Sequence, residues 1–150
     1  KNLIEEFKPN LDKKKLTVQN NLNENTKVMA DEAALKLILT NFLSNAIKHS
    51  PKKALINLAE SSSSKGFIRL SISDEGKGVP KKYKDRVFER FYRIDKGRSS
   101  ETGGTGLGLS ISKNLALMMG YSVGVEANEP KGATFFIDIK VDEEKSIQAA

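Results

Sequence analysis

The densest run of chemically suggestive residues lies between Gly103 and Leu109, where four of seven residues are glycine and a helical pattern follows directly. Glycines leave backbone amides uncovered, and a helix N-terminus carries partial positive charge, so this stretch could bind a phosphate. Its spacing fits neither the P-loop nor the Rossmann pattern. The polar run over residues 96–102 predicts a mobile flap before it. The alternative is a flexible linker that ends at a helix.

A second candidate set, Asn41, Asn45 and Lys48, is spaced by four and three residues and so forms one line along a predicted helix. Asparagine is a poor helix former, so two of them one turn apart require a reason. An amide oxygen can coordinate Mg²⁺, and a lysine one turn further can reach a phosphate. The alternative is an exposed polar helix face.

A third candidate is Asp74, at the end of a predicted strand over residues 67–74. Alternation along the strand places Asp74 on the apolar side, where a carboxylate must find a hydrogen-bond donor. The functional interpretation supplies that donor as the exocyclic amine of a purine. The alternative is a turn-forming aspartate before Gly76 and Gly78.

The elements that would position these residues follow from periodicity and breakers. The longest helix is predicted over residues 31–50, with Asp31 as N-cap and Pro51 after its end. Residues 2–9 read as an amphipathic helix stopped by Pro9. A loose turn is expected over residues 61–64, and an aromatic and basic segment at 87–93 is either ordinary core or a hinge or docking surface. Strands are predicted at residues 15–22, 26–30, 55–60, 67–74, 121–127 and 133–141.

Composition narrows the possible functions. The chain of 150 residues suits one domain, has no cysteine, and has a single histidine, His49, which argues against disulfides and protein-built zinc sites. The net charge of +6 is scattered among acidic residues and aromatic residues are few, so nucleic-acid binding is not expected. No apolar run reaches the length of a membrane span.

Taken in order, the segments resemble the catalytic ATP-binding domain of sensor histidine kinases, which has the Bergerat fold. Residues 41–50 resemble its N box, 74–78 its first glycine box, 87–93 its F box, 104–109 its second glycine box, and 132–135 its last motif. The resemblance covers nearly the whole chain. It implies an α/β fold: a two-layer α/β sandwich in which a mixed sheet carries helices on one face.

The resemblance also implies roles for individual residues. Asn45 would coordinate Mg²⁺, Asn41 would support it, and Lys48 and Arg93 would contact phosphates. Asp74 would accept from the adenine amino group, with Gly76 and Gly78 making room for the base. The other residues expected at the ATP site are His49, Gly104, Thr105, Gly106, Leu107, Gly108, Leu109 and Thr134, the last on weaker grounds because strand alternation places it opposite Phe135.

The implied function is ATP and Mg²⁺ binding for phosphorylation of a histidine on a separate dimerisation domain, followed by transfer to a response regulator. Residues 1–10 would end the preceding dimerisation helix or linker, 11–142 would form the catalytic domain, and 143–150 a tail. The fragment is expected to be a monomer and the cytoplasmic portion of a membrane-associated kinase. Two alternatives are a serine kinase of the anti-sigma-factor type and a nucleotide-sensing domain without transfer.

Overall fold

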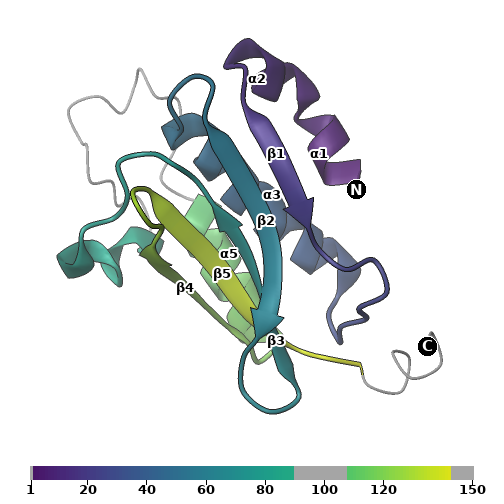
Figure 1. Ribbon diagram of the computed structural model, residues 1–150. Helices are drawn as coiled ribbons and strands as arrows, with labels where there is room; N and C mark the ends of the chain where they lie inside the picture. The colour runs from purple at the N-terminus through teal and green to yellow at the C-terminus, as the bar shows by residue number, and fades with distance from the viewer. Residues whose placement is uncertain (1, 90–107, 143–150) are drawn as a thin grey trace.

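The computed structural model describes residues 2–89 and 108–142 and has two layers, a mixed sheet and a layer of helices (Figure 1). The five-stranded sheet has the order β1-β2-β3-β5-β4. Its strands are β1 (Thr17–Asn21), β2 (Leu55–Ser62), β3 (Phe67–Ser73), β4 (Ser122–Ala127) and β5 (Ala133–Lys140). Only the β1–β2 pair is parallel; the other three pairs are antiparallel. The predicted two-layer α/β sandwich is confirmed.

Two long helices, α3 (Glu32–His49) and α5 (Gly108–Met118), cover one face of the sheet (Figure 1). The core between the layers forms where the apolar stripe of α3 meets alternate residues of the strands. Phe42 of α3 and Phe135 of β5 stack in a tilted arrangement with ring centroids 5.6 Å apart. Phe88, in the short 3-10 turn η2 (Arg86–Phe88), packs edge-on against the same Phe135 ring. The start of the aromatic and basic segment therefore belongs to the main core.

Helix α3 begins and ends where the sequence predicts. The side chain of Asp31 accepts a hydrogen bond from the backbone of Ala34 at 2.9 Å, which satisfies one of the free amides of the first turn. At the other end Ser50 is extended, with φ −76° and ψ 139°, as expected for a residue before proline.

The N-terminal segment differs from its prediction. Pro9 does not stop a helix; it lies in the first turn of α2 (Lys8–Lys13), after the short helix α1 (Asn2–Glu6). A proline fits there because the amides of a first turn have no partner within the helix.

Three strand predictions also need adjustment. Residues 26–30 form no strand and contribute only an isolated bridge between Val28 and Val141. Strand β1 begins at Thr17 because Lys15 has a left-handed backbone, with φ 56°. Strand β2 continues to Ser62, which pairs with Ile68, so the loose turn is shorter than predicted.

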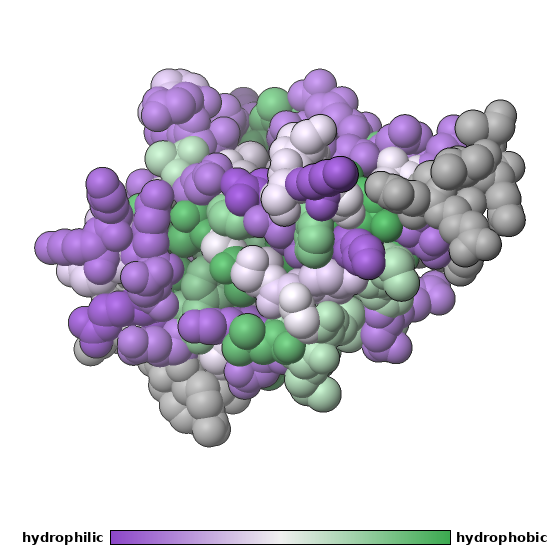
Figure 2. All heavy atoms as spheres, turned by 90° about the horizontal axis from the view of Figure 1, so that it is seen from below, coloured by the Kyte–Doolittle hydropathy of each residue, from purple (hydrophilic) through white to green (hydrophobic). Residues whose placement is uncertain are grey.

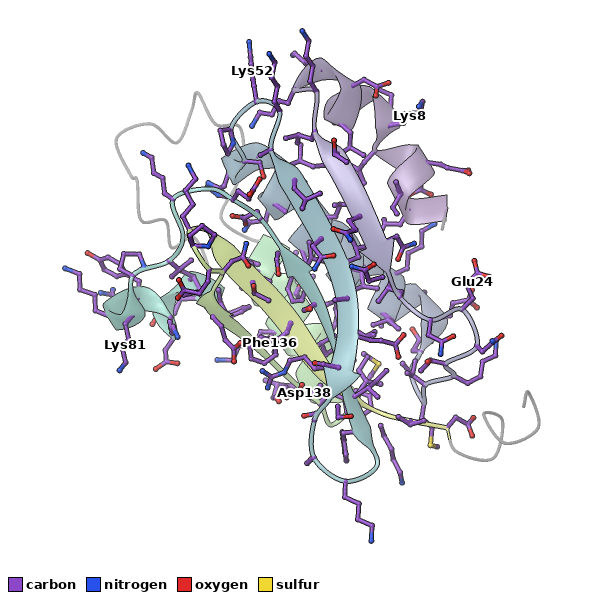
Figure 3. All side chains as sticks on the ribbon, viewed as in Figure 1. Lys8, Glu24, Lys52, Lys81, Phe136 and Asp138 are labelled. Atoms are coloured by element: carbon purple, nitrogen blue, oxygen red, sulfur yellow. The ribbon has the colours of Figure 1, made fainter. Side chains whose placement is uncertain are left out.

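The sheet face away from the helices carries a compact polar cluster around Arg69. Its guanidinium lies 3.6 Å from the ring centroid of Phe136 and forms two hydrogen bonds with Asp138, at 2.8 and 3.0 Å. Glu126 accepts a third at 2.9 Å. Phe136 and Asp138 appear on this face of β5 (Figure 3). The cluster ties β3 to β5 and β4 on the open side of the sheet.

Seen from below, the molecule shows apolar atoms among polar ones (Figure 2). The large apolar side chains that are exposed include three on α5: Ile111, Leu117 and Met118. Among the described residues, no helix is both long and apolar enough to cross a membrane.

Candidate functional site

The candidate residues meet at one end of the sheet, where α3 ends, β3 ends and β5 begins. The carbonyl oxygen of His49 would lie 2.4 Å from a Cβ at Gly76, and the carbonyl oxygen of Asp74 would lie 1.8 Å from a Cβ at Gly132. These close approaches bring the three backbone segments together. A cavity of about 310 Å³ opens beside them, lined by His49, Ser50, Pro51, Glu75, Gly76, Lys77 and Lys131.

Asp74 is buried, with 2% of its surface exposed, as strand alternation predicts. One carboxylate oxygen, Oδ1, accepts the backbone N–H groups of Gly76 at 2.8 Å and of Ala133 at 3.2 Å. The other oxygen, Oδ2, has no hydrogen-bond donor among the described residues. Burial raises the pKa of Asp74, while the two backbone hydrogen bonds and the nearby His49 lower it by less. A buried carboxylate oxygen without a donor is costly unless a ligand supplies one.

The structure shows a packing reason for the glycines of this loop. A Cβ at Gly76 would meet the His49 carbonyl, and a Cβ at Gly78, whose φ is +80°, would lie 2.8 Å from the carbonyl oxygen of Gly132. In each glycine, the hydrogen that a Cβ would replace points at protein backbone. The two glycines let the loop pack against α3 and the β5 turn, and the expectation that they also make room for a base stays a prediction.

The last turns of α3 carry Asn45, Lys48 and His49. Asn45 is half-buried, and its amide has no hydrogen bond within the described part of the chain. Desolvation is the main cause that lowers the pKa of His49; Lys48, Lys14 and Lys77 lower it further and Asp74 raises it. These effects favour the neutral form of the imidazole, which lies near three lysines.

Asn41 has a structural partner on the second helix. Its amide nitrogen donates to the carbonyl oxygen of Gly108 at 2.9 Å and to the hydroxyl of Ser112 at 3.0 Å. The Ser112 hydroxyl in turn donates to Gly108 at 3.0 Å. Asn41 thus connects α3 to the first turn of α5, in addition to any role near a metal.

Thr134 lies on the opposite side of the sheet from Asp74. Its hydroxyl is 2.7 Å from that of Ser73, its register partner on β3, and both face away from α3 and α5. The neighbouring Ala133 is the β5 residue whose backbone reaches Asp74. The adenine-side role that the resemblance implies for Thr134 stays a prediction.

Gly108 and Leu109 form the start of α5, beside Asn41. Five other predicted site residues lie outside the described part of the chain: Arg93, Gly104, Thr105, Gly106 and Leu107. The expected flap over residues 96–103 lies outside it as well.

Two residues that sequence reasoning missed also support the site. The side-chain amide of Asn128 donates to the carbonyl oxygen of Asp74 at 2.7 Å, and its backbone N–H donates to Gly132 at 3.0 Å. The Nζ of Lys14 donates to carbonyl oxygens at the end of α3. Pro130 and Gly132 indicate a turn next to Asn128 but not its contact with Asp74, and no local sequence pattern points to Lys14.

Within the described residues, no group of three or more His, Cys, Asp or Glu side chains could hold a metal ion. The amide of Asn45 is the available neutral oxygen donor at this end of α3. That donor set fits a Mg²⁺ ion held mainly by the phosphates of a nucleotide and by water, with a single protein ligand.

Comparison with known sequences gives a consistent result. The family described as histidine kinase-, DNA gyrase B-, and HSP90-like ATPase matches residues 30–143. The sensor histidine kinase WalK of Bacillus subtilis (strain 168) is 36% identical over 119 residues, which cover 79% of this chain and 20% of WalK. The chain thus spans about a fifth of that relative.

Solved structures agree with the sequence comparison. Full-length ShkA in complex with AMPPNP superimposes with a TM-score of 0.79 at 30% identity, over 93% of this chain and 28% of ShkA. The mycobacterial sensor histidine kinase MprB superimposes with a TM-score of 0.77 at 26% identity, over 93% of each chain.

Proposed function

Because the chain belongs to the histidine kinase-, DNA gyrase B- and HSP90-like ATPase family, we propose that it is the catalytic, ATP-binding domain of a sensor histidine kinase. Its task is to hold ATP with Mg²⁺ and present the γ-phosphate to a histidine on a separate dimerisation domain. From that histidine the phosphoryl group passes to an aspartate of a response regulator.

The observation that carries this proposal is the free oxygen of Asp74. Its Oδ2 is buried and has no donor among the described residues, while Oδ1 is held by two backbone amides. The exocyclic amine of adenine is a donor that fits a fixed, buried carboxylate oxygen next to Glu75 and Gly76, which line the cavity. Guanine and hypoxanthine present a carbonyl oxygen at the same position of the ring and would repel it.

The phosphates extend from the base toward α3 in this proposal. Asn45 would hold Mg²⁺, and Lys48 and His49 lie within one turn of it. A bound Mg²⁺ would neutralise part of the phosphate charge as the γ-phosphoryl group leaves. Arg93 and residues 104–107 are proposed as further phosphate contacts on the resemblance alone.

Transfer requires an acceptor from another part of the kinase. The only histidine of the chain, His49, lies at the end of α3 beside the glycine loop and is assigned to the nucleotide site. The bond between the γ-phosphorus and the bridging oxygen breaks, ADP leaves, and a bond forms to a nitrogen of the incoming imidazole. The exposed Ile111, Leu117 and Met118 on α5 offer apolar surface for docking the domain that bears it.

This role makes the chain the cytoplasmic portion of a membrane-associated sensor kinase, acting as a monomeric domain joined to the dimerisation helices. Residues 11–142 are the proposed catalytic domain.

The test is calorimetric titration of the chain with ADP and with a non-hydrolysable ATP analogue, each with and without Mg²⁺. The proposal predicts binding of both nucleotides, strengthened by Mg²⁺. A folded chain that binds neither nucleotide in either condition would overturn it. Transfer is tested by adding the histidine-bearing domain of the same kinase and ATP labelled at the γ-phosphate.

A further inference from the structure

The C-terminal end of α3 is held by a lysine from a distant part of the chain. The Nζ of Lys14 donates to the carbonyl oxygens of Ile47 at 2.7 Å, Lys48 at 3.0 Å and Ser50 at 2.9 Å. An ammonium group has three donors, and all of them are used here. The contacts span more than thirty residues of sequence, so they form only when the N-terminal segment folds against the helix.

This arrangement replaces the usual helix ending. Many helices end with a glycine in a left-handed conformation, which lets backbone amides satisfy the last carbonyls. Here Ser50 is extended and Pro51 follows, so no such cap can form. Lys14 supplies both the missing donors and a positive charge at the negative end of the helix dipole.

The turn that Lys14 holds is the turn that belongs to the proposed ATP site. It contains Lys48 and His49, and the His49 carbonyl packs against Gly76 so closely that a Cβ there would lie 2.4 Å away. The last turn of α3 is therefore fixed between Lys14 on one side and the glycine loop on the other. Movement of this turn would shift the side chains of Asn45, Lys48 and His49 together.

The neighbouring lysines do not share this geometry. Lys13 and Lys15 are exposed, and neither side chain has a hydrogen bond or an ion pair within the described residues. Lys14 is half-buried, and burial lowers its pKa. Partial burial of a charged lysine has a desolvation cost, which Lys13 and Lys15 avoid. The three hydrogen bonds of Lys14 to the end of α3 offset that cost.

We propose that Lys14 is a positioning residue for nucleotide binding: it fixes the last turn of α3 so that Asn45, Lys48 and His49 meet the phosphates. The inference rests on the proposed function and adds to it a residue from outside the motifs that resemble the family. Lys14 affects the binding of the phosphate groups of the nucleotide. The adenine half depends on Asp74, which is held by Gly76 and Ala133 instead.

The experiment compares Lys14→Met with Lys13→Met, which removes the same charge one position away. Dissociation constants for Mg-ADP and for adenosine are measured by NMR, following the imidazole signals of His49, the only histidine in the chain. We expect Lys14→Met to weaken Mg-ADP by about tenfold or more, the loss expected when a charge-assisted hydrogen bond to phosphate is misplaced. Adenosine should bind within about twofold of wild type, and Lys13→Met should leave both ligands within about twofold, below the tenfold that 1.4 kcal/mol represents.

A loss of stability alone would not move the ratio of the two dissociation constants. The proposal is overturned if Lys14→Met, measured well below its unfolding temperature, keeps the wild-type ratio of adenosine to Mg-ADP affinity. If Lys14→Met does not fold, Lys14→Gln is used, which has two N–H donors in place of three on a shorter side chain and no charge; the proposal predicts a smaller loss of Mg-ADP affinity with adenosine unchanged, and a wild-type ratio overturns the need for a lysine at this position. Wild-type chain that binds neither ligand would instead remove the proposed function, and this inference with it.

Discussion

The side-chain amide of Asn41 donates to the carbonyl oxygen of Gly108 at 2.9 Å, so the helix that carries Asn45 is tied to the first turn of α5. The same amide donates to Ser112, which is completely buried. Asn41 was predicted from sequence as a support for a metal ligand. In the structure its side chain also connects α3 to α5.

Replacing Asn41 by alanine is expected to loosen this connection. The Ser112 hydroxyl and the Gly108 carbonyl would each lose a donor in a partly buried setting, at a cost of about 1–3 kcal/mol. We predict a lower free energy of unfolding and faster hydrogen exchange in the first turn of α5. Unchanged exchange there would contradict the assignment, and Asn114→Ala, on the exposed face of α5, is the matched control.

The metal assignment is tested by Asn45→Ala. We expect the variant to keep wild-type stability within about 0.5 kcal/mol, since its amide has no hydrogen bond among the described residues. Mg²⁺ should no longer strengthen nucleotide binding in calorimetric titrations. If Mg²⁺ strengthens binding equally in wild type and variant, Asn45 is not the ligand; Asn114→Ala again serves as the control.

The substitution Asp74→Asn tests how the Asp74 carboxyl group affects the free energy of unfolding when no nucleotide is present. Because burial raises the pKa of Asp74, the unfolded chain releases this proton before the folded chain does as pH rises. Wild-type stability therefore falls between the ordinary aspartate pKa of about 3.9 and the raised value, by about 1.4 kcal/mol per unit of difference. Asparagine does not titrate, so it contributes no pH dependence of stability. Its side-chain oxygen can still accept hydrogen bonds from the backbone N–H groups of Gly76 and Ala133.

The stability of Asp74→Asn relative to wild type should thus increase as pH rises from about 4 to 7, as measured by urea denaturation. A relative stability that decreases over this range would show that the ionised carboxylate stabilises the fold instead.

Gly132→Ala should be among the most damaging small substitutions in the chain. The residue has φ +108°, and a Cβ would lie 1.8 Å from the carbonyl oxygen of Asp74. The control is Gly120→Ala, where φ is +81° but a Cβ meets no atom within 4 Å. Both variants incur the left-handed strain of about 1–2 kcal/mol, so the additional loss at Gly132 measures the clash. Equal unfolding free energies for the two variants would contradict the close packing of the β5 turn on Asp74.

Much of the fold was predictable because its signals are local. The apolar stripe of α3, its N-cap Asp31 and the alternation in β3 each depend on a few neighbouring residues, and these predictions are confirmed. The prediction that Pro9 stops a helix was wrong because proline disfavours the interior of a helix but fits its first turn, where Pro9 lies. The failure at residues 26–30 has a similar origin, since apolar residues there contact Val141 at one point rather than along a strand.

Some contacts at this end of the sheet were predictable from local patterns, and others were not. The burial of Asp74 followed from strand alternation, whereas the roles of Lys14 and Asn128 depend on contacts between segments far apart in sequence. Strand alternation predicts that Thr134 and Phe135 lie on opposite faces of the sheet. The structure confirms this, with the Thr134 hydroxyl beside that of Ser73.

The most direct test of the central claim is the contact between Asp74 and the base. Binding of ADP and IDP should be compared in wild type and in Asp74→Asn, since IDP carries a carbonyl oxygen where ADP carries its amino group. We predict that wild type prefers ADP by about tenfold to a hundredfold, as expected for a hydrogen bond to a charged group. The preference should shift toward IDP in Asp74→Asn, whose side chain can donate. Equal affinity of wild type for ADP and IDP would contradict the assignment of Asp74 as the adenine acceptor.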